Sequence, residues 1–306
     1  MMIDKSIPRV SIILPVYNGG DTLLSSVQSI VNQDYVDWEL LILDDGSTDD
    51  GLHSLSQLDD VRIKIISDGR RKGLAYRLNE GIDISSGIYL ARMDADDLAF
   101  PNRLSLQVSF MELHPEIDLL GSRALAFSLA KNLKIFGLLP YRKTHKELTD
   151  SPWRGIYLPH PTWLGRVEWF RKHRYLKPEV LRAEDQELLL RAMSQSHYYC
   201  LPEVLLAYRI GGFNLRKSIF SRLELFKAQT NIFLAHKELL YIAKAFFYLF
   251  QGYVRDIFRK IFPSIFALKF TGDGRIPEHV QYQFDGLLTT IKNVKRDEAS
   301  DCHLIG

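Results

Sequence analysis

Three aspartates within four residues form the densest group of side chains that could carry out chemistry. Asp94, Asp96 and Asp97 lie in the segment Arg92-Met-Asp-Ala-Asp-Asp97, directly after an apolar run at 88–92. Carboxylates this close repel one another unless a cation lies among them, and clusters of oxygen ligands suit Mg²⁺ or Mn²⁺. A solvated acidic turn is the alternative interpretation. The position at the end of a predicted strand favours a divalent metal site.

A second acidic pair, Asp44-Asp45, ends another apolar run. One interpretation is a turn closed by side-chain hydrogen bonds, for which this composition is typical. The other is recognition of a nucleobase, because a carboxylate at a strand end can accept the imide N–H of uracil while Tyr17 stacks on the base. Both interpretations stay open at this point.

Two basic residues lie on either side of a small turn. Lys72 and Arg77 flank the segment Gly73-Leu-Ala75. Their side chains could contact phosphate groups, or they could be ordinary surface charges.

A third acidic pair opens a helix that is predicted over 184–196. Glu184 and Asp185 at a helix N-terminus could serve only as caps. A carboxylate there could also act as a general base if a substrate hydroxyl came within hydrogen-bonding distance. His160, between Pro159 and Pro161, is a lone histidine, for which a structural role is the more common one.

These side chains need elements that bring them together, and the chain shows an alternating pattern of such elements. Buried strands are predicted at 10–16, 39–43, 61–66 and 88–92, each ending in polar turn residues. Helices are predicted at 21–33, 73–84 and 102–114. This alternation predicts an α/β fold, a mostly parallel Rossmann-like sheet with helices on both faces and ligands beyond the carboxyl ends of its strands. The polar segments after three strands should therefore converge on one crevice, where a metal could be held against a diphosphate.

The rest of the chain is less regular. Strands are predicted around 119–125, 134–138 and 198–206. After Gly211-Gly212 long helical patterns run from about 218 to 260, which indicates a helical appendage at the C-terminus.

Composition excludes several classes of protein. The chain has 306 residues, 39 basic against 37 acidic side chains and a net charge of +2, which gives no global case for a nucleic-acid binder. Its two cysteines lie far apart without a metal-binding spacing, so neither a zinc site nor a disulfide framework is expected. The N-terminus lacks the apolar stretch of a secretory signal, and no later segment is long enough to span a bilayer. A cytoplasmic location is expected.

Eight segments of the chain resemble, in order and spacing, those of family 2 glycosyltransferases, and together they cover residues 10 to about 212. They are Val10-Ser-Ile-Ile-Leu-Pro-Val-Tyr-Asn18, Asp44-Asp-Gly-Ser-Thr-Asp49, Gly73-Leu-Ala-Tyr-Arg-Leu-Asn-Glu-Gly81, Gly87-Ile-Tyr-Leu-Ala-Arg-Met-Asp-Ala-Asp-Asp97, Pro101-Asn-Arg-Leu104, His160-Pro-Thr162, Glu184-Asp185 and Tyr208-Arg209. The resemblance implies the GT-A fold, a nucleotide-diphosphate sugar donor, a Mn²⁺ or Mg²⁺ cofactor and inversion at the anomeric carbon. Within that family, the chain most resembles enzymes of bacterial polysaccharide and glycolipid synthesis.

The resemblance also implies roles for individual residues. The nucleotide-binding positions are Pro15, Tyr17, Asn18, Asp44, Asp45, Lys72, Arg77 and Asp94. Asp94 would contact the ribose or the metal, Asp96 would ligate the metal and Asp185 would be the general base. Expected near the acceptor, or in support of the site, are His160, Glu184, Arg191 and Arg209. Two departures stand out: Arg92-Met93 replaces residues that are usually apolar, and 213–306 has no general counterpart.

On this basis the chain divides into a nucleotide-sugar-binding half at 1–125, an acceptor-binding half at 126–215 and a helical appendage at 216–306. The expected activity is transfer of a sugar, from a UDP-sugar by preference, to a hydroxyl of a glycan or lipid-linked saccharide. A catalytically degenerate sugar-nucleotide-binding scaffold is the main alternative. A sugar nucleotidyltransferase is disfavoured because no glycine-rich basic loop follows the first strand, and a dehydrogenase because GxGxxG is absent.

The segment 237–270 is rich in aromatic and basic residues at helical spacing. An amphipathic helix of this kind usually packs on its own protein or on a partner subunit. It could instead dock on a membrane surface, with Lys244, Arg255, Arg259 and Lys260 meeting anionic headgroups. The second interpretation would place the protein peripherally on the inner face of the cell membrane.

Overall fold

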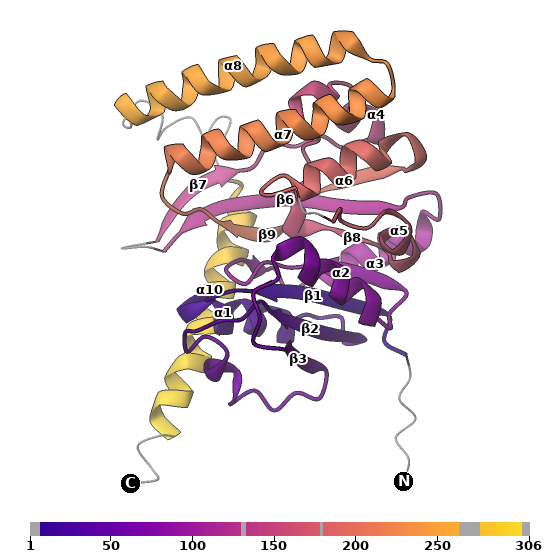
Figure 1. Ribbon diagram of the computed structural model, residues 1–306. Coiled ribbons are helices and arrows are strands. Elements are labelled where there is room, and N and C mark those ends of the chain that lie inside the picture. Colours follow the sequence, from indigo (N-terminus) through magenta and orange to yellow (C-terminus); the bar gives the residue numbers. More distant parts are fainter. Residues whose placement is uncertain (1–6, 130–132, 178–179, 263–275, 302–306) are drawn as a thin grey trace.

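A computed structural model describes residues 7–129, 133–177, 180–262 and 276–301, with side chains to residue 291 (Figure 1). Its first half is built on four parallel strands in the order β3-β2-β1-β4. They are β1 (Val10–Val16), β2 (Trp38–Asp44), β3 (Ile63–Ser67) and β4 (Tyr89–Arg92). Each lies within two residues of a predicted strand, and the parallel arrangement is the one that the βα alternation requires.

The second half extends the same sheet. β8 (Leu164–Arg166) pairs antiparallel with both β4 and β6 (Leu119–Ser128), and so joins the two halves. β6 runs parallel to β9 (Tyr198–Arg209), and β5 (Leu98–Ala99) and β7 (Lys134–Leu138) pair antiparallel with β9 and β6. β6 runs across the boundary expected at 125/126, so the two halves share one continuous sheet.

Helices cover both faces of the sheet because the strands are apolar on both sides. Alternate residues of β1 point to opposite faces: Ile12 packs in the core that includes α1 (Gly20–Val31) and α3 (Arg103–Leu113), whereas Ile13 packs with α2 (Leu74–Ile84). The face that carries α2 also carries α5 (Val167–His173) and α6 (Glu184–Ala192). A short α4 (His145–Thr149) begins with a capping box between Thr144 and Glu147. Single 3₁₀ turns lie at His53–Leu55, Pro152–Arg154, His160–Thr162 and Met193–Gln195.

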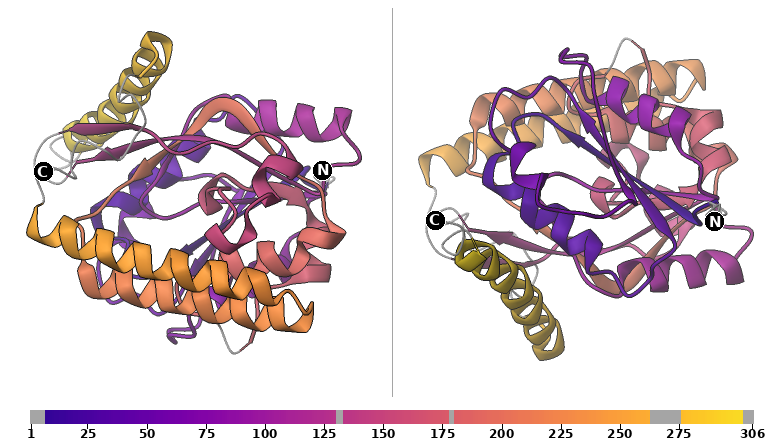
Figure 2. Two further views of the ribbon diagram at one scale, coloured as in Figure 1. Left: turned by 90° about the horizontal axis from the view of Figure 1, so that it is seen from above. Right: turned by 90° about the horizontal axis from the view of Figure 1, so that it is seen from below.

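The C-terminal helices do not form one appendage. The helical pattern at 218–260 is two helices, α7 (Leu215–Ala235) and α8 (Leu239–Ile261), separated at Lys237, whose φ of +60° ends the first helix. They lie side by side on the α6 side of the sheet (Figures 1 and 2). α10 (Glu278–Asp301) packs instead against β5, β6 and β9, where Phe284 meets Phe100 and Phe127.

No helix among the described residues is both long enough and apolar enough to cross a membrane. Residues 263–270 of the aromatic segment lie outside the described residues.

Candidate active site

An open cleft of about 1330 Å³ lies where β1, β2 and β4 end, as the strand order predicts. Its wall takes residues from both halves of the sheet. Those that the sequence singled out are Tyr17, Asp45, Lys72, Asp94, His160, Glu184 and Asp185. The acidic segments after β2 and β4 therefore converge with the first turn of α6, which is more than 90 residues further along the chain.

Asp45 is fixed at the cleft wall by the loop that precedes α2. Its carboxylate accepts the backbone N–H groups of Lys72, at 2.7 Å, and Gly73, at 3.1 Å. Gly73 has φ of +93°, which favours glycine, and this conformation aims its N–H at the carboxylate. Among the described residues Oδ2 accepts only the Gly73 N–H, so it keeps a lone pair for a ligand N–H in the cleft.

Arg77, expected at the nucleotide, lies apart from the described cleft wall. Its side chain is fully buried, and its guanidinium binds Asp45 at 3.2 Å, Asp68 at 2.7 Å and Glu80 at 2.8 Å. It also donates to the Arg70 carbonyl. Although burial alone would lower the pKa of Arg77, these carboxylates raise it, so the cation is permanent. It cannot contact phosphate in this arrangement, and it positions Asp45 instead.

Three other residues expected at the nucleotide hold loops together. Asp44 is buried and accepts hydrogen bonds from the Ser47 N–H and the Ser67 hydroxyl, which keep its pKa low although burial opposes this. Asn18, at φ of +54°, accepts the Thr48 N–H through its side chain. Pro15 is a buried residue of β1. None of the three lies on the cleft wall as described, so the turn interpretation of Asp44 fits its contacts.

Tyr17 is an exposed aromatic ring at the edge of the cleft. The Arg71 guanidinium lies 4.1 Å from the centre of that ring. Lys72 lies next to it in sequence, and its ammonium group pairs with Asp68 and contacts the Tyr76 hydroxyl at 3.3 Å. The Arg71 guanidinium thus lies over one face of the ring, and this side of the cleft combines an aromatic ring with two cations, which suits a base joined to phosphate.

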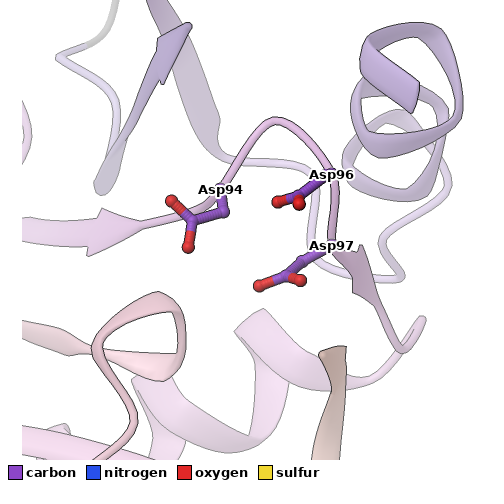
Figure 3. A group of neighbouring side chains, drawn as sticks. All are labelled: Asp94, Asp96 and Asp97. Atoms are coloured by element: carbon purple, nitrogen blue, oxygen red, sulfur yellow. The ribbon is translucent and has the colours of Figure 1, made fainter. Parts of the chain in front are cut away.

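The 94–97 loop gathers its three aspartates within a small space. One carboxylate oxygen each from Asp94, Asp96 and Asp97 lie within 4.8 Å of one another. In Figure 3 the Asp96 and Asp97 side chains both extend from the loop toward Asp94. Arg92, the unusual residue before the motif, is buried and clamps Asp94 with two bonds of 2.5 and 2.6 Å. A fixed cation thus neutralises one of the three carboxylates.

Backbone contacts hold this loop in place. The hydroxyls of Thr22 and Ser26, on the first turns of α1, donate to the carbonyls of Ala95 and Asp94 at 3.1 and 2.8 Å. From β9, Arg209 donates its Nε–H to the Asp96 carbonyl at 2.7 Å. The Arg209 backbone N–H donates to Asp97 Oδ1 at 2.7 Å. Arg209 thus supports the acidic loop.

The three aspartates fit a divalent cation. Asp97 is buried, and its Oδ2 has no hydrogen-bond donor among the described residues. Burial and the charges of Asp94 and Asp96 raise the pKa of Asp97 well above its ordinary value. Partial desolvation and the Asp94 charge also raise the pKa of Asp96, whose side chain still reaches solvent. A hard cation bound to these oxygens would relieve the repulsion.

Asp185 faces the cleft from the first turn of α6, where the helix dipole favours a carboxylate. Its Oδ2 accepts a hydrogen bond of 3.3 Å from Gln186. Gln186 is itself fixed by two hydrogen bonds with the backbone of Ile156. Desolvation raises the pKa of Asp185, against the opposing effect of Gln186 and of the Arg92 charge. The carboxylate is thus poised to take up a proton at higher pH than an ordinary aspartate.

His160 is buried at the cleft wall with its Nε2 2.7 Å from the Tyr175 hydroxyl. Burial and the charge of Arg92 lower the pKa of His160 well below its ordinary value, so it is neutral near pH 7. The turn that carries it is braced by the segment after Pro101: Gln107 donates to the Thr162 carbonyl, and Arg103 donates to the Arg92 carbonyl.

Arg191, expected near the acceptor or in support of the site, lies where α5 and α6 pack together. Its guanidinium binds Glu187 at 2.7 Å and caps the carbonyls of His173 and Arg174 at the end of α5. It is not part of the cleft wall described above, so it supports the α5–α6 packing and does not orient a ligand.

Several cleft residues were not found from the sequence. They are Arg71, Tyr76, Tyr157, Lys177, Arg182, Gln186 and Tyr208. The run Arg70-Arg71-Lys72 was a visible signal for Arg71, because a cluster of cations directly precedes the turn at Gly73. Arg182, two residues before Glu184, has φ of +62°, a conformation that sequence does not reveal.

A family model described as Glycosyl transferase family 2 matches residues 11–174. The putative glycosyltransferase EpsE of Bacillus subtilis is 42% identical over 123 residues, 39% of this chain and 44% of EpsE. An uncharacterized glycosyltransferase of Haemophilus influenzae is 30% identical over 227 residues, 71% of this chain and 70% of that protein.

A third relative, from Escherichia coli, is the UDP-Glc:alpha-D-GlcNAc-diphosphoundecaprenol beta-1,3-glucosyltransferase WfgD. It is 38% identical over 102 residues, which are 33% of this chain and 40% of WfgD. The matched segments of EpsE and WfgD thus span less than half of those proteins.

Two solved structures resemble the whole arrangement. S. aureus TarS 1-349 in complex with UDP-GlcNAc aligns with a TM-score of 0.60 and 19% identity, over 92% of this chain and 80% of that one. The mannosyltransferase PcManGT from Pyrobaculum calidifontis, in complex with GDP-Man and Mn²⁺, aligns with a TM-score of 0.58 and 16% identity, over 98% of this chain and 86% of that one.

Proposed function

The chain belongs to glycosyl transferase family 2 and has the GT-A fold, and on this premise we propose that it is an inverting transferase of a hexose from a UDP-sugar. The acceptor would be a hydroxyl of a saccharide carried on a lipid diphosphate. The observation that carries the proposal is the convergence in one cleft of Tyr17, Asp45, Asp94 and Asp185, with Asp96 and Asp97 clustered beside Asp94.

The donor would lie along the first half of the cleft. The Tyr17 ring would stack on the base, and the free lone pair of Asp45 would accept its imide N–H. Arg71 and Lys72 supply positive charge beside that position. UDP is favoured because WfgD is named for UDP-Glc and the TarS structure holds UDP-GlcNAc, whereas PcManGT holds GDP-Man.

The diphosphate would lie against the 94–97 loop, with Asp96, Asp94 and Asp97 as candidate ligands of Mn²⁺ or Mg²⁺. A bound divalent ion supplies charge neutralisation on the departing diphosphate. Arg209 and the α1 hydroxyls hold the loop, so the ligand oxygens are already in place when the donor arrives.

Asp185 would act as the general base. Its carboxylate takes the proton of the acceptor hydroxyl as the oxygen forms a bond to the anomeric carbon, and the bond from that carbon to the diphosphate oxygen breaks with its electron pair. Attack on the face opposite the leaving group converts an α-linked donor into a β-linked product. His160, neutral and bonded to Tyr175, is the next candidate for the base.

The acceptor class follows from one relative. The name of WfgD specifies an acceptor on diphosphoundecaprenol. In this chain the cleft continues past Asp185 to Tyr157 and to Ser221 of α7, which leaves room for an acceptor on the α7–α8 side.

Calorimetry with UDP-Glc, UDP-GlcNAc and GDP-Man, in Mn²⁺ and in EDTA, tests the proposal. We expect one UDP-sugar to bind in the presence of Mn²⁺ and to be transferred or slowly hydrolysed. Binding without any turnover of donor, with a range of lipid-linked acceptors, would instead identify a non-catalytic sugar-nucleotide scaffold. Absence of binding to all three donors would refute the assignment of the cleft.

A further inference from the structure

The outer face of α8 is apolar and largely exposed. Nine large apolar side chains on it are each between 39% and 66% exposed: Leu239, Leu240, Phe246, Phe247, Phe250, Val254, Ile257, Phe258 and Ile261. At 100° per residue they fall within an arc of about 120°, along a helix about 34 Å long. A continuous patch of this kind marks an interaction surface.

The inner face of α8 fixes this orientation. Ala245, Leu249, Gly252 and Asp256 are its buried positions. Asp256 binds Arg222 of α7 at 2.7 Å and also accepts the Ser218 hydroxyl. A Cβ on Gly252 would lie 2.5 Å from the Arg222 guanidinium, so a larger residue there would displace that side chain. The Asp256–Arg222 ion pair and the contact between Gly252 and Arg222 lie opposite the apolar arc. A rotation of α8 about its own axis that buried the arc would therefore break both.

The charges around the arc are positive. Asp256 is the single acidic residue of α8, and it is buried in its pair with Arg222. Arg255 and Lys260 are exposed on the two sides of the arc. Lys244 lies on the same side of the apolar arc as Arg255, and its ammonium group lies over the Trp153 ring. The exposed surface of α8 therefore complements an anionic partner that also offers an apolar layer.

The arc lies near the cleft. Tyr157 lines the cleft, and its hydroxyl is 3.5 Å from the hydroxyl of Tyr248 on α8. Ser221, the residue directly before Arg222, also lines the cleft. α8 is the outermost layer on this side of the molecule, with α7 between it and the sheet (Figure 1).

We propose that the apolar arc of α8 docks the protein on an anionic lipid surface, with α8 lying in the plane of the interface. The aromatic and aliphatic side chains enter the acyl boundary, and Arg255 and Lys260 meet the headgroups. The inference rests on the proposed function in one respect, because docking brings the α7–α8 end of the cleft to the surface where a lipid-linked acceptor is confined.

A second copy of the chain is a poorer occupant of the arc. Two α8 helices packed face to face would bring the basic borders together, and neither offers an exposed carboxylate to pair with them. A lipid surface satisfies both the apolar arc and its cations.

Flotation of the full chain with vesicles tests the proposal without donor or acceptor. The vesicles are phosphatidylcholine alone, or phosphatidylcholine with about one third phosphatidylglycerol. We expect flotation with the anionic vesicles and a marked loss at about 0.5 M salt, because exposed charges are then screened. The double variant Phe247→Gln, Phe250→Gln should partition at least about tenfold more weakly. Arg255→Ser and Lys260→Ser should each cost about fivefold.

The matched control changes two exposed apolar residues elsewhere. Val61 and Leu113 are 94% and 78% exposed and lie away from α8. Val61→Gln with Leu113→Gln should float like the unchanged protein. Donor hydrolysis in detergent-free buffer should be the same in all variants, so a failure of docking is distinguishable from a failure of the proposed activity.

Three results would overturn the proposal. One is that the unchanged protein stays at the bottom of the gradient with both kinds of vesicle. Another is that the α8 double variant floats as well as the control. The third is that light scattering finds the unchanged protein to be a dimer that does not float with vesicles, while the double variant is a monomer. This result would assign the arc to a second copy of the chain.

Discussion

Replacing Arg92 by methionine tests how the acidic loop is held. Arg92 is buried, lines the cleft and binds both oxygens of Asp94. Its Nε has no hydrogen-bond acceptor among the described residues, so the pair with Asp94 is its main compensation for burial. Methionine keeps much of the volume and removes the charge. Asp94 then stands beside Asp96 and Asp97 without a cation.

The magnitude follows from how exposed the two partners are. Removing one member of a fully buried ion pair costs about 3–5 kcal/mol, because the other charge is left unpaired. The Asp94 side chain is 28% exposed, so water compensates part of this loss. We therefore expect the variant to lose about 2–3 kcal/mol of unfolding free energy, which for a chain of this size lowers Tm by about 3–5 °C.

A double-mutant cycle isolates the pair. Asp94→Asn alone leaves Arg92 buried without its anion, and the variant with both changes removes both charges. If the pair is responsible, the double variant is more stable than Arg92→Met alone, with a coupling of at least about 1 kcal/mol. Differential scanning calorimetry in EDTA measures this directly. Arg92→Lys keeps the charge but not the two-point contact, and should fall between the unchanged protein and Arg92→Met.

Arg9→Met is the matched control, since it breaks an ion pair with Glu112 in which both side chains are exposed. Such pairs contribute about 0–1 kcal/mol. The interpretation of Arg92 would be refuted if Arg92→Met changed Tm no more than this control, or if the cycle showed no coupling. Either result would mean that the loop is held by its backbone contacts alone.

Three further predictions concern the cleft. Asp96→Ala should reduce the affinity for UDP in Mn²⁺ to the value measured in EDTA, and unchanged calorimetric affinity would move the metal ligand elsewhere. Asp185→Asn should keep donor binding while the rate of transfer falls by about 10²–10⁴-fold. In the unchanged protein the rate of transfer should fall as the pH drops through the pKa of Asp185, because only the ionised carboxylate accepts the proton. That pKa is raised above the ordinary aspartate value near 3.9. Turnover of Asp185→Asn at the unchanged rate would favour His160. Arg77→Met should lower the free energy of unfolding, measured in urea, by about 3 kcal/mol and should weaken UDP binding, because it leaves Asp45 without its cation. An unchanged affinity for UDP would show that the N–H groups of the loop are enough to hold Asp45 in place.

The strands and their order were predictable because their patterns are local. Val10–Val16 is a continuous apolar run that ends in turn residues, and each polar cluster follows such a run. In a parallel sheet this placement alone brings Asp45 and Asp94 to one edge. The convergence of the polar residues that follow β1, β2 and β4 could therefore be predicted from spacing, whereas Asp185 was placed at the site only by the family resemblance.

The direction of individual side chains could not be predicted. Asp44 and Asp45 are neighbours of the same type, yet one turns back to Ser47 and Ser67 while the other faces the cleft. Arg77 was indistinguishable in sequence from a phosphate ligand, because its burial depends on three carboxylates from different segments. Arg92 was visible only as a departure from the family pattern.

In the C-terminal helices, too, local sequence patterns could not predict contacts between distant segments. Helical periodicity predicted that 218–260 is helical, but not the break at Lys237, which depends on a backbone conformation. It also could not decide which face of α8 packs inward. That choice depends on Arg222 and Asp256, whose pairing joins two helices.

The short strand β8 limits how this protein can be recombined. Because β8 pairs with β4 on one side and with β6 on the other, its three residues join the first and second halves of the chain into one sheet. A chimera cut near residue 125 would sever β6 and leave β4 facing a foreign edge. Exchange of acceptor preference by whole-segment grafting therefore has to carry β8 with the first half, or confine itself to the loops that surround the cleft.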